Sequence, residues 1–301
     1  MAVSKEFFDQ IKQFRKQCTI NDDKRDEGLP HDIPEVKRID NLHYGPDPKW
    51  NALDIYLPNN VKPPYPTIVY IHGGGWCYGT KDTFQYYGMG LAKYGFAVAN
   101  ASYHLAPENG GFPAELNEVD QYIQWLDDHA DEYHFDRNNF FITGDSAGGQ
   151  LAEQYAAILS EPAYAKLYPY KPLNLKFRAA AFNCAATFVL TPAMSGPESI
   201  GRANFTPESV KKYHKQLATE SYIDKNFLPT YLLTANKDIV HDYQMMLYGL
   251  MLGRGVEVIC KSYGTDKNPR YHGFFTDQKD HDLAKKANDG EMAFFKDHIV
   301  K

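Results

Sequence analysis

Short apolar runs alternate with amphipathic segments along most of this 301-residue chain. The runs that predict strands are 52–57, 67–71, 96–100, 140–143, 179–186, 230–235 and 256–263. Apolar residues at helical spacing predict helices over 84–94, 114–129, 147–159, 240–252 and 282–299. Strands separated by helices imply right-handed crossovers, and therefore a mostly parallel sheet with helices on both faces.

Two regions interrupt this alternation. Near the start, apolar residues at helical spacing predict an amphipathic helix over 3–18, and the polar stretch 21–35, which contains two prolines, predicts a linker. The second region, 187–225, is rich in proline and glycine and then contains short helical stretches. Because an insertion of this size above the strand ends often forms a lid, we expect a lid here.

Composition narrows the class of protein. Hydrophobic residues make up 43% of the chain and charged residues 23%, values typical of a soluble globular protein. The formal net charge of -6 includes no long block of like charge, which argues against a nucleic-acid partner.

Targeting signals and cysteines indicate a compartment. Residues 1–10 lack the apolar core of a signal peptide, and no apolar run approaches the roughly 18–20 residues that span a bilayer. The four cysteines have no metal-type spacing and are typical of free thiols in a reducing compartment. We therefore expect a cytoplasmic protein with no membrane insertion, no structural metal and no cofactor.

The segment 144–149 reads Gly-Asp-Ser-Ala-Gly-Gly, follows a predicted strand and opens a predicted helix. A nucleophilic serine needs a sharp turn that exposes its hydroxyl, so the residues two before and two after it must be small. The helix that follows offers unpaired N–H groups and a partial positive charge. A glycine-rich turn with a capping serine would show the same pattern, but the strand-turn-helix context favours Ser146 as a nucleophile.

The segment 72–76 reads His-Gly-Gly-Gly-Trp and also follows a predicted strand. Three glycines let the backbone approach a substrate closely and point N–H groups toward it. Such donors stabilise the oxyanion of a tetrahedral intermediate, and each is typically worth about 3 kcal/mol. The alternative is a phosphate-binding loop, which is disfavoured because no Lys-Ser or Lys-Thr pair follows and Trp76 would crowd a phosphate.

A serine nucleophile also needs a histidine and an acid. Asp238 lies three residues past the predicted strand 230–235, where a buried acid would hold the histidine tautomer and stabilise its imidazolium. A surface aspartate that caps the next helix would fit the same pattern, and Asp242 and Asp266 are alternatives for the acid. His272 follows the last predicted strand through a polar loop and stands beside a glycine.

Other chemistries lack their motifs in this sequence. There is no H-E-x-x-H zinc motif, no Walker A loop and no G-x-G-x-x-G after a strand. The acidic pairs do not suggest a glycosidase, and Cys77, the thiol nearest to a motif, has no evident base. These absences leave acyl transfer as the chemistry that the motifs favour.

These segments resemble a known family. The motifs HGGGW and GDSAGG, with Tyr-His-Gly-Phe at 271–274 and an intervening acid, resemble α/β-hydrolase fold esterases of the hormone-sensitive-lipase-like and bacterial feruloyl-esterase-like carboxylesterase groups. Residues 103–108 (YHLAPE) and 112–114 (FPA) resemble the Y-R-L-A-P-E and F-P-A signature of that group. The resemblance runs from about residue 52 to the C-terminus.

The resemblance implies a fold and a domain organisation. The fold is an α/β-hydrolase fold with a mostly parallel eight-stranded sheet, helices on both faces and a small cap or lid. Residues 1–45 would be an N-terminal helix and linker that belong to the cap. Residues 46–301 would form the catalytic domain, with a lid insertion at about 187–225.

The resemblance also implies a role for each matching residue. Ser146 would be the nucleophile, His272 the general base and acid, and Asp238 the acid that orients the histidine. The backbone N–H groups that form the oxyanion hole would belong to Gly74, Gly75 and Ala147.

Residues near these motifs supply candidates for the substrate pocket and two departures from the family pattern. Trp76, Tyr78 and Tyr103 are candidates for the substrate pocket, although core packing is the more frequent fate of such side chains. Two positions depart from the family pattern, since His104 replaces the usual arginine and Asn236 stands where a glycine is usual. We expect the first departure to remove a family ion pair and the second to be mild, because asparagine tolerates left-handed backbone.

These features predict a cofactor-free serine carboxylesterase that hydrolyses small acyl or aryl esters through an acyl-enzyme intermediate. Long-chain lipid fits less well, because no exposed apolar helix for interfacial binding is evident. The alternatives are a carbohydrate acetyl or feruloyl esterase, an aryl-formamidase, and a non-catalytic ligand-binding α/β-hydrolase. The expected partner is a small-molecule ester, and a homo-oligomer is left open.

Overall fold

The computed structural model describes residues 4–301, and one eight-stranded sheet forms the centre of this described part. The strands are β1 (Val36–His43), β2 (Ala52–Pro58), β3 (Tyr65–Ile71), β4 (Ala97–Ala101), β5 (Phe135–Asp145), β6 (Phe177–Asn183), β7 (Thr230–Ala235) and β8 (Val258–Tyr263). They lie in the order β1-β2-β4-β3-β5-β6-β7-β8. The pairs β1–β2 and β2–β4 are antiparallel, and the pairs from β4 to β8 are parallel, which confirms the predicted α/β-hydrolase architecture.

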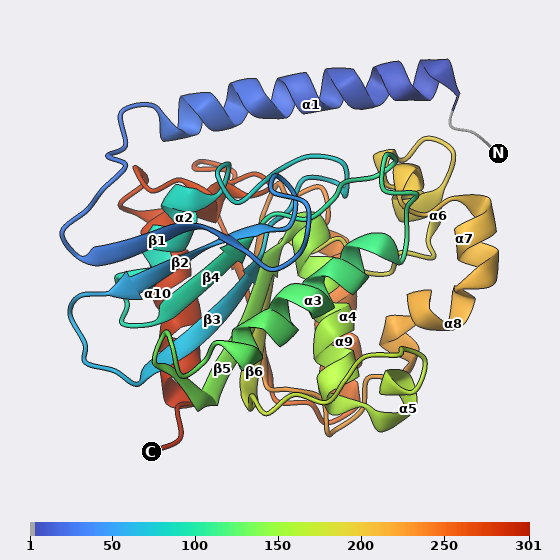
Figure 1. Ribbon diagram of the computed structural model, residues 1–301. Coiled ribbons are helices and arrows are strands. Elements are labelled where there is room, and N and C mark those ends of the chain that lie inside the picture. Colours follow the sequence, from blue (N-terminus) through green and yellow to red (C-terminus); the bar gives the residue numbers. More distant parts are fainter. Residues whose placement is uncertain (1–3) are drawn as a thin grey trace.

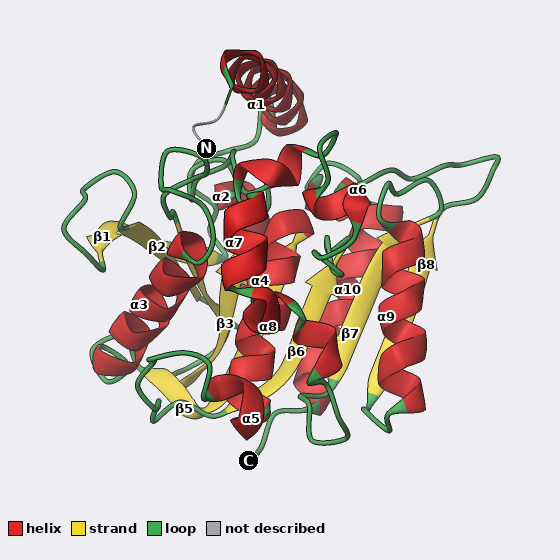
Figure 2. Cartoon of the chain, turned by 90° about the vertical axis from the view of Figure 1, so that its right-hand side faces the viewer, coloured by secondary structure: helices red, strands yellow, loops and turns green. Residues whose placement is uncertain are grey.

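Helices cover both faces of this sheet. The longer helices are α1 (Lys5–Asp26), α2 (Gln85–Ala92), α3 (Ala114–Asp128), α4 (Ser146–Ser160), α9 (His241–Gly253) and α10 (Leu283–Asp297). Helices α3, α4 and α9 lie on one face and α2 and α10 on the other (Figures 1 and 2). The central strands are therefore buried on both faces, and this is why they appear in the sequence as continuous apolar runs.

The strand β1 was missed by the sequence pattern. It is an edge strand whose buried and exposed positions do not alternate regularly, and it carries several charged side chains. Its neighbour β2 was predicted from an alternating pattern, yet all seven of its residues are buried. The burial of β2 is therefore decided by the elements that pack around it in the fold, and its alternating sequence pattern does not reveal it.

The N-terminal helix is longer than predicted. Helix α1 starts at Lys5, capped by the Ser4 side chain, and continues to Asp26, so the predicted linker is wrong over residues 21–26. Residue Val3 of the predicted helix lies outside the described residues. The extra turns are polar, and Arg25 in the last turn makes contacts with the rest of the chain that a local pattern cannot reveal. Helix α1 lies across one edge of the sheet (Figure 1).

The predicted insertion 187–225 contains only short helices. They are α6 (Pro192–Ser195), η1 (Ile200–Ala203), α7 (Pro207–Lys212), α8 (His214–Leu217) and η2 (Thr219–Ser221). Two further short elements of the chain are α5 (Pro162–Ala165) and η3 (Phe274–Thr276). The division into a cap and a catalytic domain, and a lid function for 187–225, stay predictions.

Within residues 4–301, no helix combines the length and the apolar character that a membrane span requires.

Candidate active site

A sharp turn joins β5 to α4 at the predicted nucleophile. Ser146 is the first residue of α4 and has a left-handed φ of 53°, which is strained for a residue with a side chain. A Cβ atom at Gly144 would meet the Gly148 carbonyl oxygen, and one at Gly148 would meet the Ile71 carbonyl oxygen. The glycines of the motif are therefore required by close backbone packing around Ser146.

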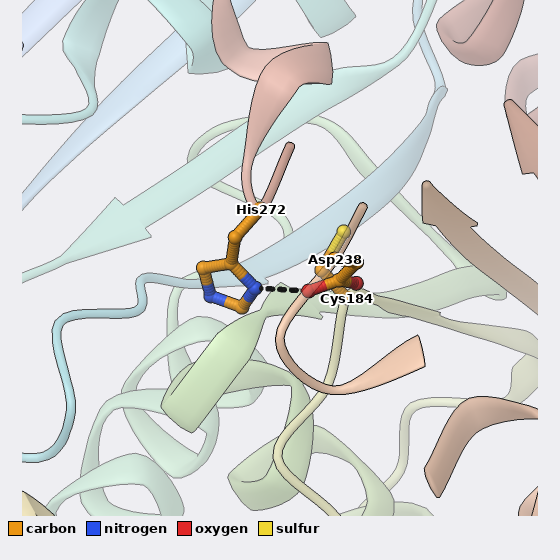
Figure 3. Close-up of side chains that lie close together, drawn as sticks. All are labelled: Cys184, Asp238 and His272. Carbon is orange, nitrogen blue, oxygen red and sulfur yellow. Dashed lines mark hydrogen bonds and ion pairs between the residues drawn. The ribbon is translucent and has the colours of Figure 1, made fainter. Parts of the chain in front are cut away.

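The structure brings the predicted serine, histidine and acid together. His272 Nε2 lies 2.8 Å from Ser146 Oγ, and His272 Nδ1 lies 2.6 Å from Asp238 Oδ1. Asp238 follows β7 and His272 follows β8, so neighbouring strands deliver both side chains to one edge of the sheet. With its proton on Nδ1, the imidazole donates to Asp238 and accepts from the serine hydroxyl. Figure 3 shows the ring facing the carboxylate.

Asp238 is a buried carboxylate with several donors. Its oxygens accept hydrogen bonds from the Thr234 hydroxyl at 2.8 Å and from the Val240 N–H at 3.1 Å. Burial alone would raise the pKa of Asp238, but the hydrogen bond and charge of His272, with the other donors, hold that pKa below its ordinary value. Asp238 is therefore suited to stay ionised beside His272.

The two alternative acids lie elsewhere. The side chain of Asp242 is 95% exposed and pairs with His241, and that of Asp266 is 91% exposed and pairs with Lys237. Neither carboxylate contacts His272, so geometry favours Asp238 among the three acids.

Residues 72–76, called here the oxyanion loop, follow β3 beside the serine. Gly74 and Gly75 have φ values of 119° and 59°, a backbone region that favours glycine. Among residues 4–301, the N–H groups of these two glycines form no hydrogen bond. Ala147 is the second residue of α4, so its N–H belongs to the first turn, where helical partners are missing. All three predicted donors thus lie next to Ser146.

A buried carboxylate holds this loop in place. Asp145 Oδ1 accepts hydrogen bonds from the Gly73 N–H at 2.8 Å and from the Tyr70 hydroxyl at 2.6 Å. Burial raises the pKa of Asp145 to about 6, against the effect of these two donors. Asp145 was quoted in the serine motif, but its contact with the oxyanion loop could not be predicted from the motif alone.

Tyr103 stands behind the oxyanion loop and does not line the pocket, so this predicted pocket residue is corrected. Its ring stacks on that of His72 with centroids 4.2 Å apart, and its hydroxyl donates to the His72 carbonyl at 2.6 Å. The side chain is buried. Its place is explained by packing, the alternative that the sequence had left open.

A cavity of about 640 Å³ opens above Ser146 and His272. The predicted pocket residues Trp76 and Tyr78 line it, and five residues of α1 cover it. We call these five residues the roof: Phe14, Cys18, Asn21, Asp22 and Arg25. The sequence predicted the helix but not that its middle and C-terminal turns would cover the site.

Side chains of α1 hold the roof to the loops below. Arg25 Nη2 donates to the Thr83 carbonyl at 2.8 Å, and the same guanidinium pairs with Asp22 and Asp26. The Asp22 carboxylate accepts a hydrogen bond from the Tyr78 hydroxyl at 2.8 Å. One wall of the cavity is therefore polar, and hydrogen bonds of Arg25 and Asp22 fix it to the loops.

His104 and Asn236, the two departures from the family pattern, each contact residues far away in the sequence or on another loop. His104 Nδ1 lies 2.7 Å from a Glu118 oxygen, and its Nε2 lies 3.3 Å from Asp47, so acidic partners surround the histidine. Asn236 Oδ1 accepts a hydrogen bond from the Arg270 N–H at 3.0 Å. The asparagine thereby ties the loop that carries His272 to the end of β7.

Cys184 was also missed. It directly follows β6 and lies beside Asp238 and His272 (Figure 3). The predicted strand 179–186 contains Cys184, whereas β6 ends at Asn183, so the sequence pattern gave no signal that this thiol lies at the carboxyl edge of the sheet, where ligands bind.

The sheet and the Ser146 turn define an α/β-hydrolase of the serine hydrolase class. Comparison with family models narrows this further, since the BD-FAE model matches residues 53–246, more than half of the chain. The chain belongs to the BD-FAE family.

Curated relatives include carboxylesterase NlhH of Mycobacterium tuberculosis, 32% identical over 131 residues, which are 43% of this chain and 40% of the relative. Arylacetamide deacetylase of Bos taurus is 34% identical over 119 residues, which are 38% of this chain and 30% of that protein. The chain thus spans less than half of the length of either relative.

Solved structures share the fold over nearly the whole chain. Esterase B of Lactobacillus rhamnosis, with a C4-C4 tributyrin phosphonate inhibitor, is 21% identical, has a TM-score of 0.87, and is matched over 98% of this chain and 96% of its own. This likeness shows the fold alone.

Proposed function

We propose that this protein is a serine carboxylesterase that hydrolyses small acyl or aryl esters through an acyl-enzyme intermediate. The observation that carries the proposal is the hydrogen-bonded chain from Ser146 Oγ through His272 to the buried Asp238. Membership of the BD-FAE family and relatives named carboxylesterase and deacetylase support hydrolysis of an acyl bond.

In the acylation step, Ser146 Oγ attacks the ester carbonyl while His272 Nε2 accepts its proton. The 2.8 Å separation of these atoms supports direct transfer. Asp238 keeps the other ring proton on Nδ1 and stabilises the imidazolium that forms. The N–H groups of Gly74, Gly75 and Ala147 donate to the oxyanion of the tetrahedral intermediate.

Collapse of this intermediate completes the cycle. His272 returns the proton to the alcohol oxygen, and the alcohol leaves. Water then attacks the acyl group on Ser146 with His272 as the base, and the free acid is released. Each proton moves through the same imidazole, so the side chains of this site suffice for the reaction.

The cavity supports a small substrate. Its volume of about 640 Å³ must hold both the acyl part and the alcohol part of the ester. Its apolar lining includes Phe14, Met194 and Ile200, which suit an acyl chain or an aryl group.

The polar wall favours a second candidate function, hydrolysis of acetyl or feruloyl esters of carbohydrates. Asn21, Asp22, Tyr78 and Asp277 line the cavity and offer hydrogen bonds to the hydroxyl groups of a sugar alcohol. This candidate uses the same serine chemistry and differs only in the leaving alcohol.

A ladder of p-nitrophenyl esters from acetyl to decanoyl tests the proposal, with Ser146→Ala as the matched variant. We expect turnover that peaks at short chains and is lost in the variant. Unchanged hydrolysis by Ser146→Ala would refute the role of the serine. Activity on acetylated xylan or methyl ferulate, with little on the ladder, would support the second candidate.

We further propose a cytoplasmic location, which the four free thiols support. A homo-oligomer stays a prediction, which light scattering of the purified protein can test.

A further inference from the structure

A thiol lies beside the acid and the imidazole. Cys184 is buried directly after β6 and has a left-handed φ of 46°. Each of Cys184, Asp238 and His272 offers one possible ligand atom, and these three atoms lie within 4.8 Å of one another. Among residues 4–301, no other group of three or more His, Cys, Asp or Glu side chains has such spacing. Figure 3 shows Cys184 close to the Asp238 carboxylate.

These three side chains suit a zinc ion chemically. Zn²⁺ binds thiolate, imidazole and carboxylate at about 2.0–2.3 Å, so two tetrahedral ligand atoms lie about 3.3–3.8 Å apart. Nδ1 of His272 and Oδ1 of Asp238 are 2.6 Å apart, and no pair of the three atoms exceeds 4.8 Å. Small side-chain movements therefore reach the required geometry.

The charges also match. A thiolate and a carboxylate carry two negative charges, which neutralise Zn²⁺ and leave no net charge in a buried site. Of the three side chains only His272 lines the cavity, with 27% of its side chain exposed, whereas Cys184 and Asp238 are buried behind it. The imidazole is thus the ligand that first meets an entering ion, and its ring must move to admit the ion to Cys184 and Asp238.

We propose that Cys184, Asp238 and His272 form an inhibitory site for a thiophilic divalent cation such as Zn²⁺. The S–H bond of Cys184 breaks, a metal–sulfur bond forms, and the proton leaves to solvent. The N–H bond at Nδ1 of His272 breaks, a metal–nitrogen bond forms there, and the ring takes up one proton at Nε2, so the imidazole stays neutral and no electrons are transferred.

Binding of the metal ion prevents His272 from acting as the general base. The hydrogen bond from Nδ1 to Asp238 is lost, and a protonated Nε2 cannot accept the proton of Ser146. The inhibition rests on the proposed function, whereas metal binding itself does not. The two parts can therefore be measured separately.

Cobalt(II) provides a readout that is independent of turnover. Titration of the purified protein with cobalt chloride should produce a thiolate-to-cobalt charge-transfer absorption. The absorption should vanish in Cys184→Ala and persist in Cys18→Ser, which removes the thiol that lines the cavity. An absorption that survives in Cys184→Ala, or none in the wild type, overturns the site.

Zinc inhibition tests the consequence. Zinc chloride should inhibit hydrolysis of p-nitrophenyl butyrate, and EDTA should restore it. Relative to its own uninhibited rate, Cys184→Ala should need at least about tenfold more zinc for half inhibition. Cys184→Ser serves if the alanine variant fails to fold.

The outcomes separate the two proposals. An active Cys184→Ala enzyme with the zinc sensitivity of the wild type contradicts the metal site but not the esterase. A cobalt absorption in a protein without esterase activity supports the metal site and contradicts the proposed function.

Discussion

Two of the reacting side chains, those of Ser146 and His272, border the same cavity as the roof, but the reacting side chains and the roof are anchored differently. Ser146 and Asp238 follow β5 and β7 closely, so the backbone of the sheet positions them, and the loop that carries His272 after β8 is tied to the end of β7 by Asn236. Helix α1 reaches the rest of the protein through side chains, the buried Phe7 and Ile11 near its start and the guanidinium groups of Arg15 and Arg25 further along. A single substitution can therefore loosen the roof, whereas Ser146 and Asp238 change position only if the sheet does.

The largest loss of catalytic rate is expected when the acid Asp238 is replaced. Asp238→Asn should lower kcat by about 10³–10⁴-fold, because asparagine favours the wrong histidine tautomer. The fold should survive, since the amide oxygen can still accept from the Thr234 hydroxyl. The rate on p-nitrophenyl acetate and a thermal melt measure both effects, with the exposed Asp242→Asn as the control. A near-normal rate in Asp238→Asn would remove this residue from the mechanism.

The next effect tests the support of the oxyanion loop. Asp145→Ala leaves the Tyr70 hydroxyl and the Gly73 N–H without their acceptor, and each unpaired buried donor costs about 1–3 kcal/mol. We expect lower stability and a kcat reduced by about 10²-fold, in the range for a lost oxyanion donor. Asp145→Asn keeps an acceptor oxygen and should retain most of both quantities. Equal losses in the two variants would contradict this account.

The third prediction concerns pH. Burial raises the pKa of Glu291 from 4.5 to about 7, although its oxygens accept from Thr143 and Asn183. Because the unfolded chain loses this proton first, the group contributes stability fully below about pH 4.5, and that contribution is lost as pH rises through 7. Glu291→Gln should remove this decline, which amounts to at most about 3 kcal/mol. Urea unfolding at pH 5 and pH 8 measures it, and an equal decline in both proteins would refute it.

The fourth prediction concerns a substitution that loosens only the roof. Arg25→Ala removes the bonds to the Thr83 carbonyl, Asp22 and Asp26. We expect a KM raised several-fold, faster proteolysis within α1, and a global melting temperature close to that of wild type. Lys12→Ala, which breaks only an exposed pair with Asp9, is the matched control. A variant with slower kcat and unchanged KM would mean that α1 positions the reacting groups.

The smallest effect is expected at the cavity rim. Ile239 is 81% exposed yet lines the cavity, so its replacement should not disturb the core. Ile239→Ser should reduce kcat/KM for a hexanoyl ester about fivefold, roughly the 1 kcal/mol of a lost apolar contact, and affect an acetyl ester less. Equal losses on both esters would show that the chain does not reach this rim.

The sheet and most of its helices were predictable because the buried strands are local apolar runs and most of them are followed by a helical pattern. The edge strand β1 was not, because its polar residues carry no such signal. The last turns of α1 also escaped prediction, because they are stabilised by contacts such as that between Arg25 and Thr83, far apart in sequence.

The candidate site likewise has residues that the sequence predicted and contacts that it did not. Ser146, His272 and Asp238 were predicted because each follows a strand within a motif or at a fixed offset. The contacts of Asp145 with Gly73 and of Cys184 with Asp238 join different strands, so only the folded structure reveals them.

Labelling with a p-nitrophenyl alkyl phosphonate tests the central claim most directly. The account predicts stoichiometric phosphonylation of Ser146, seen by peptide mass mapping, with parallel loss of esterase activity and no label in Ser146→Ala. An active enzyme whose label lies on another residue, or which takes no label, would contradict it.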